Sequence, residues 1–379
     1  MKHYLHAIAT LIGTIIGAGV LGIPYVVAQA GFLSSLVTII VLGIIVMFVF
    51  LYVGEIVLRT KGNHQMTGYC EKYLGKTGKV IMAVSMIIGI YGALIAYFIG
   101  ESYTLSSIFG GNPFYYNIGF FILVSTIIYF GLKAVENSEL VLSSIVLLII
   151  FILVVLSFKH VNLNNLNHFS MSKMFLPYGV ILFSYLGFVA VPEMKEELKG
   201  NLKSLKKAII FGSLIPIVAY LLFSFVVVGV VGLDYFNSIN PNERIATIAL
   251  GNLLGQSMFL FGNLFAVFAM LTSFLTLALA LKEMYIFDYK INKNVAWALT
   301  CIIPFVIGLL NVTDFIQIIA MTGVVAGGID GILIVLMTMK AKKMGDRKPE
   351  YTIKMNWPIA SFFILIFVSG ALLHFLNII

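Results

Sequence analysis

Apolar runs separated by short polar segments are the dominant pattern of this chain. Runs of about eighteen residues or more recur from one end to the other, which is the length an α-helix needs to cross a bilayer. The alternating pattern of a β-barrel strand is absent. We therefore predict an all-α polytopic membrane protein. Its eleven expected spans lie near residues 5–30, 33–58, 80–108, 115–132, 139–158, 174–193, 208–232, 255–281, 295–311, 315–339 and 357–378.

The first expected span contains an internal break. Its glycines at 13, 17, 19 and 22 are followed by Pro24, a combination that weakens a helix. In hydrocarbon an unpaired N–H or C=O group costs several kcal/mol, so a broken span persists only where the break lines a cavity. Close packing of helices through Gly13 and Gly17 is the alternative explanation. The break is therefore the first place to expect a ligand.

A matching break occurs in the sixth expected span. Gly19 and Pro24 are five residues apart, and Gly187 and Pro192 repeat that spacing further along the chain. The two spans run in opposite directions in the predicted topology. Paired breaks in inverted halves indicate a transporter site near the bilayer midplane. We expect two inverted five-helix repeats, 1–158 and 159–339, and then an inner loop and eleventh helix, 340–379.

Composition and charge agree with a membrane protein. The 379 residues are 60% hydrophobic and 11% charged, well below the charged share of soluble proteins. With the N-terminus inside, all but three of the 24 Lys and Arg residues fall on the inner side. The exceptions are Lys159, Lys173 and Arg244. The net charge of +8 then reflects membrane topology and does not require a nucleic-acid partner.

An odd number of spans places the C-terminus outside. We expect a multi-pass protein of the cell membrane with no obligate protein partner. The first apolar run carries the break and is expected to remain in the mature chain. Cys70 and Cys301 fall in different settings and suggest neither a disulfide nor a metal site.

The chemistry of the two breaks suits a zwitterion. Unwinding at Gly17, Ala18 and Gly19 leaves amide N–H groups at a helix N-terminus, where a carboxylate is favoured. Unwinding near Phe183–Gly187 leaves carbonyls at a helix C-terminus, where an ammonium is favoured. Free amino acids are the commonest small zwitterions. The rings of Phe183 and Tyr185 are candidates to close over such a substrate.

These motifs resemble a known family. The residues Gly-Ala-Gly-Val-Leu-Gly-Ile-Pro-Tyr-Val-Val-Ala-Gln-Ala-Gly at 17–31 are similar to the first helix of the amino acid/auxin permease family. The residues Phe-Ser-Tyr-Leu-Gly-Phe-Val-Ala-Val-Pro-Glu-Met at 183–194 are similar to its sixth helix. That family belongs to the amino acid–polyamine–organocation superfamily. The resemblance implies a 5+5 inverted-repeat fold and alternating access. It also implies substrate-binding residues at Gly17, Ala18, Gly19, Phe183, Ser184, Tyr185 and Gly187.

A coupling-ion site is expected in helix 8. The pattern Ala269, Thr272, Ser273 is similar to a sodium site of several transporters with this fold, and the resemblance adds the carbonyls of Gly13 and Ile16. Such oxygen ligands suit a hard monovalent cation. Some relatives have asparagine where this chain has Gly13, and some proton-coupled relatives have a lysine in helix 5. The fifth span, 139–158, contains no lysine, which favours sodium over protons.

Few acidic residues fall within the spans. Asp330 lies well inside the tenth span and is a candidate for carrying a proton or for gating. Glu193 ends the helix 6 motif beside the inner vestibule and is a second candidate. Glu55, Glu101 and Glu283 lie near helix ends, where solvent or lysine meets them. The six histidines have no metal-ligand spacing.

The sequence therefore predicts a secondary active transporter that imports neutral amino acids with a cation. No Lys, Arg, Asp or Glu falls at the centre of helices 1, 3, 6 or 8, which favours a neutral substrate. A proton-coupled permease and a non-transporting amino acid sensor of the same fold remain as alternatives. An enzyme is not expected, because no paired acidic motif appears at an interface. No cofactor is expected beyond a coupling sodium ion.

Overall fold

The structure is a computed structural model that describes residues 2–62, 64–130, 133–310 and 312–378, without the side chains at 2, 133–142, 287, 377 and 378. The end of the predicted span 115–132 and the first side chains of span 139–158 thus lie outside the described residues. Helices make up the described chain, and no strand occurs in these ranges.

The described residues of the first half form six α-helices, and these correspond to the first five predicted spans. They are α1 (Lys2–Ile15), α2 (Gly19–Ala30), α3 (Phe32–Arg59), α4 (Met66–Phe109), α5 (Pro113–Phe130) and α6 (Lys133–Phe158). Helix α4 is kinked at Gly75, whose φ of 74° is not helical. A short helix at residues 66–74, which were expected to be part of a polar connector, therefore precedes the helix of the third predicted span.

In the second half, the residues that the structure describes form nine α-helices. They are α7 (Pro177–Ser184), α8 (Ala190–Glu197), α9 (Leu205–Ser238), α10 (Ala246–Leu254), α11 (Gln256–Phe287), α12 (Lys293–Leu309), α13 (Phe315–Thr322), α14 (Gly328–Met344) and α15 (Trp357–Ile378). A π-helical turn, Gly323–Gly327, joins α13 to α14. Short 3₁₀ turns occupy the connectors at Leu163–Leu166, Met171–Lys173, Leu202–Ser204 and Pro241–Glu243.

Membrane-length helices dominate this fold. Seven described helices are long and apolar enough to cross a bilayer, and eight if α1 and α2 count as one bent span. Three shorter apolar segments, 143–158, 171–184 and 293–309, lie on further predicted spans. The pattern of apolar runs thus predicted the helical membrane fold correctly.

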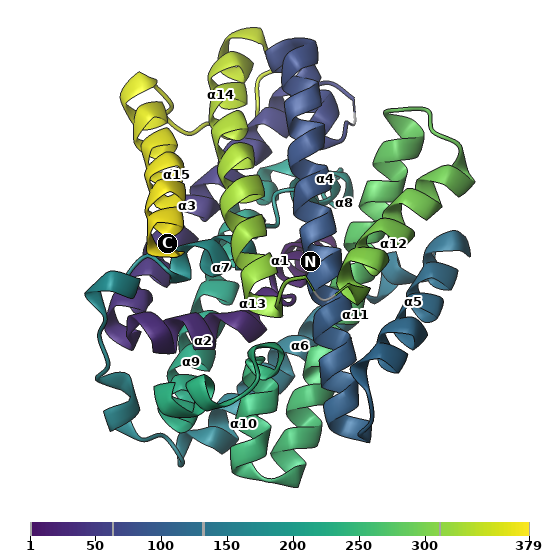
Figure 1. The fold of residues 1–379 in the computed structure, drawn as a ribbon. Coiled ribbons are helices and arrows are strands. Elements are labelled where there is room, and N and C mark those ends of the chain that lie inside the picture. Colours follow the sequence, from purple (N-terminus) through teal and green to yellow (C-terminus); the bar gives the residue numbers. More distant parts are fainter. Residues whose placement is uncertain (1, 63, 131–132, 311, 379) are drawn as a thin grey trace.

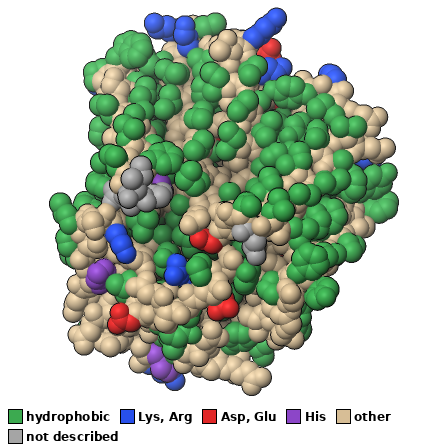
Figure 2. All heavy atoms as spheres, in the orientation of Figure 1, with side chains coloured by type: hydrophobic (Ala, Val, Ile, Leu, Met, Phe, Trp, Pro, Cys, Tyr) green, Lys and Arg blue, Asp and Glu red, His purple; other side chains and the backbone are tan. Residues whose placement is uncertain are grey.

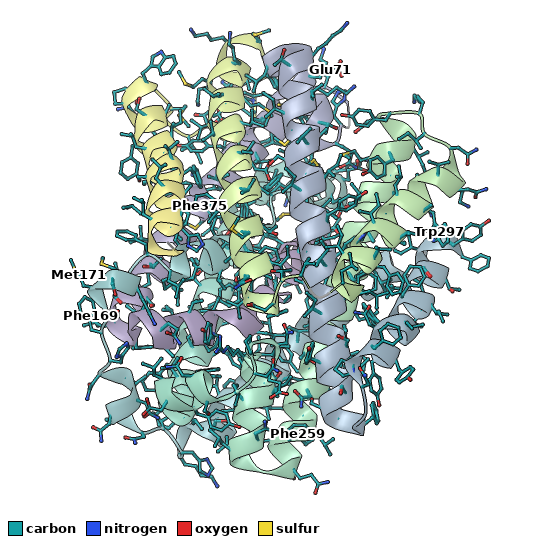
Figure 3. All side chains as sticks on the ribbon, viewed as in Figure 1. Glu71, Phe169, Met171, Phe259, Trp297 and Phe375 are labelled. Atoms are coloured by element: carbon teal, nitrogen blue, oxygen red, sulfur yellow. The ribbon has the colours of Figure 1, made fainter. Side chains whose placement is uncertain are left out.

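The helices form one bundle around α4. This helix packs against α5, α11, α12, α13 and α14. In Figure 1, α15 lies at one edge beside α14, and α5 and α12 lie at the opposite edge. Figure 3 places Glu71, near the start of α4, at one end of the bundle and Phe259, near the start of α11, at the other, so these two helices are antiparallel.

The exterior of the bundle is apolar, as lipid contact requires. Figure 2 shows hydrophobic side chains over most of the visible face, and Lys and Arg side chains gather at its top edge. At that end, the buried carboxylate of Glu55 accepts hydrogen bonds from Arg59, Lys342 and the Ile353 amide, each at 2.8 Å. The expected partnership of Glu55 with a nearby cation is therefore present.

Both predicted breaks occur. Helices α1 and α2 meet at an angle of 52° across residues 16–18. Helices α7 and α8 are separated by residues 185–189. Pro192 is the third residue of α8, where a helix does not need the missing N–H. The glycines allow the helices to be interrupted, and Pro192 is compatible with the first turn of the helix that follows the second break.

Candidate functional site: a pocket where two broken helices meet

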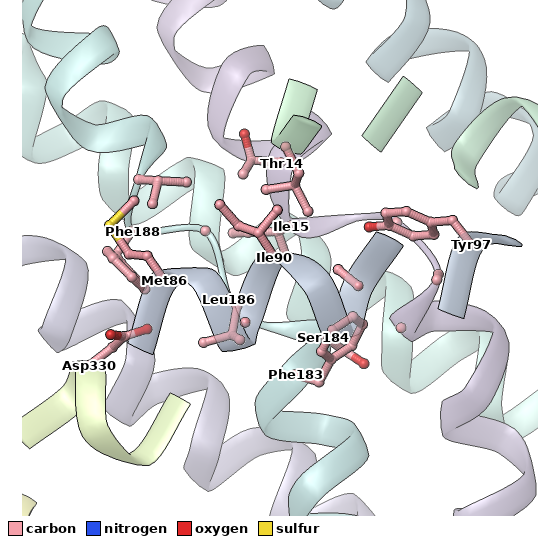
Figure 4. Close-up of a pocket in the computed structure, with 18 residues that line it drawn as sticks. Thr14, Ile15, Met86, Ile90, Tyr97, Phe183, Ser184, Leu186, Phe188 and Asp330 are labelled. Carbon is pink, nitrogen blue, oxygen red and sulfur yellow. The ribbon is translucent and has the colours of Figure 1, made fainter. Parts of the chain in front are cut away.

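One pocket lies where the two breaks meet (Figure 4). Its cavity volume is about 60 Å³, which leaves room for a few water molecules in this conformation. Both breaks and helices α4, α11 and α14 contribute to its wall. The lining residues are Thr14, Ile15, Gly17, Ala18, Gly19, Met86, Gly89, Ile90, Ala93, Tyr97, Phe183, Ser184, Leu186, Gly187, Phe188, Val189, Leu277 and Asp330.

The start of α2 packs directly against the end of α7. A Cβ atom on Gly19 would lie 2.6 Å from the Cα atom of Ser184, closer than side chains approach backbone. Only glycine allows this approach, because no rotamer change at Ser184 could move a backbone atom away. Gly187 is similar, since its Cβ would lie 2.7 Å from Cγ1 of Ile15. The glycines of both motifs therefore bring the two breaks together.

Tyr220 of α9 links the two broken helices. Its hydroxyl lies 2.9 Å from the carbonyl oxygen of Ile15, the last residue of α1, and 2.8 Å from that of Ser184, the last residue of α7. Both carbonyls lie at helix ends and lack the usual intrahelical partner. The sequence analysis missed Tyr220, because a tyrosine in an apolar run has no signal beyond its residue type.

The backbone of the breaks supplies both donors and acceptors. By helix geometry the Ala18 and Gly19 amides at the start of α2 have no intrahelical partner. Leu21 N–H donates to the Ala18 carbonyl at 3.0 Å, and Gly17 N–H donates to the Ile15 carbonyl at 3.1 Å. At the end of α7, the Ile181 and Phe183 carbonyls accept from Tyr185 and Leu186. Each of these carbonyls keeps a second lone pair. The arrangement can accept hydrogen bonds from an ammonium and donate them to a carboxylate.

Most of the expected substrate-binding residues line the pocket. Gly17, Ala18, Gly19, Phe183, Ser184 and Gly187 are all lining residues. Tyr185 is not. Its hydroxyl donates to the Ile39 carbonyl of α3 at 3.1 Å, and its ring lies 5.2 Å from that of Tyr220. The Tyr185 ring therefore packs between α3 and α9 and does not face the pocket.

The expected ion-site residues are only partly brought together. Ser273 faces the first break, since a Cβ on Gly17 would lie 2.7 Å from its hydroxyl oxygen. That hydroxyl is buried beside Tyr97 and makes no hydrogen bond of ordinary geometry to a described residue. Thr272 instead donates to the Phe268 and Ala269 carbonyls of its own helix, at 2.9 and 3.2 Å.

Gly13 and Ile16 lie in the wall behind the pocket. Ile16 N–H continues α1 with a hydrogen bond to the Ile12 carbonyl at 2.8 Å. Gly13 faces Ser143 of α6, whose hydroxyl oxygen would lie 2.6 Å from a Cβ placed on Gly13. The Ser143 hydroxyl donates to the Ala9 carbonyl at 3.1 Å. A neutral residue of the fifth span thus contacts α1 at this position.

The two acidic candidates differ in their surroundings. Asp330 lines the pocket, is 3% exposed, and its Oδ1 atom has no hydrogen-bond partner in the part of the chain that is described. Glu193 is exposed on α8. Among the lining residues there is no Lys, Arg or His, so the pocket is apolar apart from its backbone end, a few hydroxyls and Asp330.

Polar contacts hold both ends of the broken helices. At one end, the Thr10 hydroxyl of α1 donates to Glu197 of α8 at 2.9 Å. Burial raises the pKa of Glu197, and the Thr10 hydrogen bond opposes this increase. At the other end, Arg244 donates to the Tyr25 hydroxyl of α2 at 3.0 Å. These contacts join the half-helices to their neighbours above and below the pocket.

The residues that form the apolar middle of the pocket were also missed. Met86, Gly89, Ile90, Ala93 and Tyr97 come from one face of α4, as their helical spacing allows. None of these residues was predicted from the sequence. Their spacing could have suggested one face of that helix, but an apolar residue facing a pocket has the same pattern as one facing the core.

Comparison with known proteins identifies relatives over nearly the whole chain. The family model described as tryptophan/tyrosine permease family matches residues 1–374. A tyrosine-specific transport system 1 of Haemophilus influenzae is 26% identical over 357 residues, covering 89% of this chain and 88% of its own. A tryptophan-specific transport protein of Shigella flexneri is 24% identical over 391 residues, covering 96% and 93%.

A third relative is named for a different substrate. The glutamine transporter 2 of Aliivibrio fischeri is 24% identical over 328 residues and covers 83% of each chain. Among solved structures, that of MhsT in complex with L-phenylalanine has a TM-score of 0.68 at 16% identity, and it covers 99% of this chain and 98% of its own. This similarity shows the fold. The finer resemblance to the amino acid/auxin permease family is not confirmed by these comparisons.

Proposed function

Because the chain belongs to the tryptophan/tyrosine permease family, it is an amino acid transporter, and we propose that it imports neutral amino acids, aromatic ones included, by cation-coupled alternating access. The observation that supports this most is the pocket at the two breaks. A polar backbone end adjoins a mainly apolar interior there, and no cationic residue lines the wall. Relatives named for tyrosine, tryptophan and glutamine agree with a neutral substrate.

The substrate's charged groups would bind at the breaks. Amides at the start of α2, from Ala18 and Gly19, would donate to the carboxylate, where the helix N-terminus adds a partial positive charge. Carbonyls at the end of α7, near Phe183 and Ser184, would accept from the ammonium. Every neutral amino acid has these two groups, so this end of the pocket would recognise the whole class.

Alternating access would use the broken halves as moving parts. The half-helices α1 and α8 lie on the inner side, and their Thr10–Glu197 hydrogen bond would open and close with them. The halves α2 and α7 would remain around the substrate. The two expected repeats, 1–158 and 159–339, would move against each other, with 340–379 as an addition outside them.

Sodium is the proposed coupling ion. Ser273 faces the first break with an unsatisfied buried hydroxyl, which supports a cation site between α11 and α1. Ala269, Thr272 and the carbonyls of Gly13 and Ile16 complete the proposed ligand set. Thr272 would have to turn from its own helix to join it. Ser143 of the fifth span faces Gly13 and is neutral. The lysine that some proton-coupled relatives have in helix 5 is therefore not found at this contact, which favours sodium.

Uptake into proteoliposomes tests both parts of the proposal. Labelled tyrosine should accumulate on an imposed sodium gradient, and Ser273→Ala should reduce the sodium response more than Thr272→Val. Uptake driven equally well by a proton gradient would contradict sodium coupling and favour the proton-coupled alternative with Asp330 or Glu193. Binding without any uptake would indicate a sensor.

A further inference from the structure

We propose that Asp330 determines substrate choice by accepting a hydrogen bond from a donor at the tip of an otherwise apolar substrate side chain. The phenol of tyrosine and the indole N–H of tryptophan are such donors. The inference rests on the proposed function, because it assigns a role to the far end of the same pocket. It gives Asp330 a different role from the proton-carrying or gating roles considered above.

The pocket is elongated, and Asp330 lies at one of its ends. In Figure 4, Tyr97 and Asp330 are at opposite ends of the lining, with Ser184 on the side of Tyr97 and Met86 beside Asp330. Ile90 and Leu186 lie between them. A substrate whose charged groups bind at the breaks would therefore extend its side chain past apolar residues toward Asp330.

The length of this path suits an aromatic amino acid. Gly92 of α4 packs against Thr322, and the next residue, Gly323, packs against Phe183, so Gly92 marks the level of the second break. Ser85 of α4 donates to the Ala326 carbonyl at 3.3 Å, one helical turn before Asp330. Seven residues separate Ser85 from Gly92, or about 10 Å along the helix. Tyrosine and tryptophan have lengths of this order.

The Asp330 carboxyl group has one unsatisfied oxygen atom. The Ser85 hydroxyl lies beside the carboxyl group but also donates to the Ala326 carbonyl at 3.3 Å. Asp330 is 3% exposed, and its Oδ1 atom accepts no hydrogen bond of ordinary geometry from any described residue. A buried acceptor without a donor is costly, so a ligand that supplies the donor is favoured over one that does not. Sites built in this way reject analogues that lack the donor far better than apolar pockets reject a missing methylene group.

Competition against labelled tyrosine uptake by the reconstituted full-length protein tests the proposal. Tyrosine should compete about 10- to 100-fold better than phenylalanine, the range expected for a hydrogen bond to a charged group. O-methyltyrosine, which keeps the ring and the oxygen but has no donor hydrogen, should compete as weakly as phenylalanine. These measurements on the unaltered protein do not depend on whether a variant folds.

Two variants of Asp330 separate substrate choice from coupling. Asp330→Leu should remove the preference for tyrosine over phenylalanine, and Asp330→Asn, which keeps an acceptor oxygen, should retain part of it. Glu101→Met is the matched control, because Glu101 is equally buried but does not line the pocket. It should leave the ratio unchanged.

Each negative result has its own meaning. Equal competition by tyrosine and phenylalanine in the unaltered protein would overturn the role of Asp330 while leaving neutral amino acid transport intact. An equal loss of both substrates in both Asp330 variants, at unchanged thermal stability, would overturn it in favour of coupling or gating. A protein that takes up no neutral amino acid would instead refute the proposed function.

Discussion

Gly19 illustrates how a single missing side chain shapes the site. It is the first residue of α2, and its Cα approaches the backbone of Ser184 so closely that a Cβ would lie 2.6 Å from the Ser184 Cα. The contact joins the two breaks at the level where we place the substrate's charged groups. Any side chain at this position must push the two half-helices apart.

We expect Gly19→Ala to reduce tyrosine uptake about tenfold. Overpacking against backbone costs about 1–3 kcal/mol, and the displacement would fall on the amides proposed to bind the carboxylate. The measurement is the KM and maximal rate of uptake, together with the melting temperature. Gly119→Ala is the control, since a Cβ at this α5 position meets nothing within 4 Å. Unchanged uptake in Gly19→Ala would argue against substrate binding at this contact.

Glu101 departs from the expectation that glutamates near helix ends meet solvent or lysine. It is 0% exposed in α4, and neither of its carboxyl oxygens has a hydrogen-bond partner within the described ranges. The sequence placed it near the end of a span but could not show that Met270 of α11 and Phe315 of α13 pack against the adjacent Gly100 of α4. Burial without a partner is therefore a tertiary effect.

We expect Glu101→Met to raise the melting temperature of the purified protein. Methionine has a similar length, and replacing an unsatisfied buried carboxyl with an apolar group removes a cost of about 1–3 kcal/mol. Glu71→Met is the comparison, because Glu71 forms an exposed pair with Lys79, and such pairs contribute little. A lower melting temperature for Glu101→Met than for the unaltered protein would show that the carboxyl has a stabilising role.

At the scale of elements, the breaks were predictable and their neighbours were not. Glycine and proline act locally, so the breaks could be located from the sequence to within two residues. They were expected at 17–19 and 183–187 and lie at 16–18 and 185–189. The direction of Tyr185 could not, because the face that a residue presents beside a break depends on the rotation of each half-helix. The π-helical turn at Gly323–Gly327 was missed for a similar reason, since it accommodates tight packing against α7.

Tyr220 allows a test of whether the two breaks must be linked, because its hydroxyl lies between the ends of two broken helices. Tyr220→Phe should lower both the melting temperature and the uptake rate, the latter several-fold, since the two buried carbonyls lose the one hydroxyl hydrogen that they share. Tyr178→Phe is the control, because its hydroxyl contacts the Phe367 carbonyl of α15 away from the pocket. If both variants reduced uptake equally, the link between the breaks would have no specific role.

At the scale of the whole molecule, the distribution of basic residues predicts the orientation in the membrane, which the helix bundle alone does not. The bundle itself has no preferred direction across a bilayer. The sequence supplies one, because 21 of its 24 basic residues fall in segments on one side of the predicted topology. On that side, Asp346 pairs with Lys72 and accepts from the Lys61 amide, and these contacts hold its pKa below the usual range.

We therefore expect the loop after α14 to lie inside the cell and the loop after α6 outside. The two native cysteines, Cys70 and Cys301, are buried, so thiol labelling has a low background. On intact cells, a membrane-impermeant maleimide should label Met171→Cys and should label Lys348→Cys only after permeabilisation, since both positions are exposed.

A cysteine added after the last residue should behave like Met171→Cys, because eleven spans return the chain to the outside. Labelling of Lys348→Cys on intact cells would reverse the orientation, and a protected C-terminal cysteine beside a labelled Met171→Cys would mean that the number of spans is even.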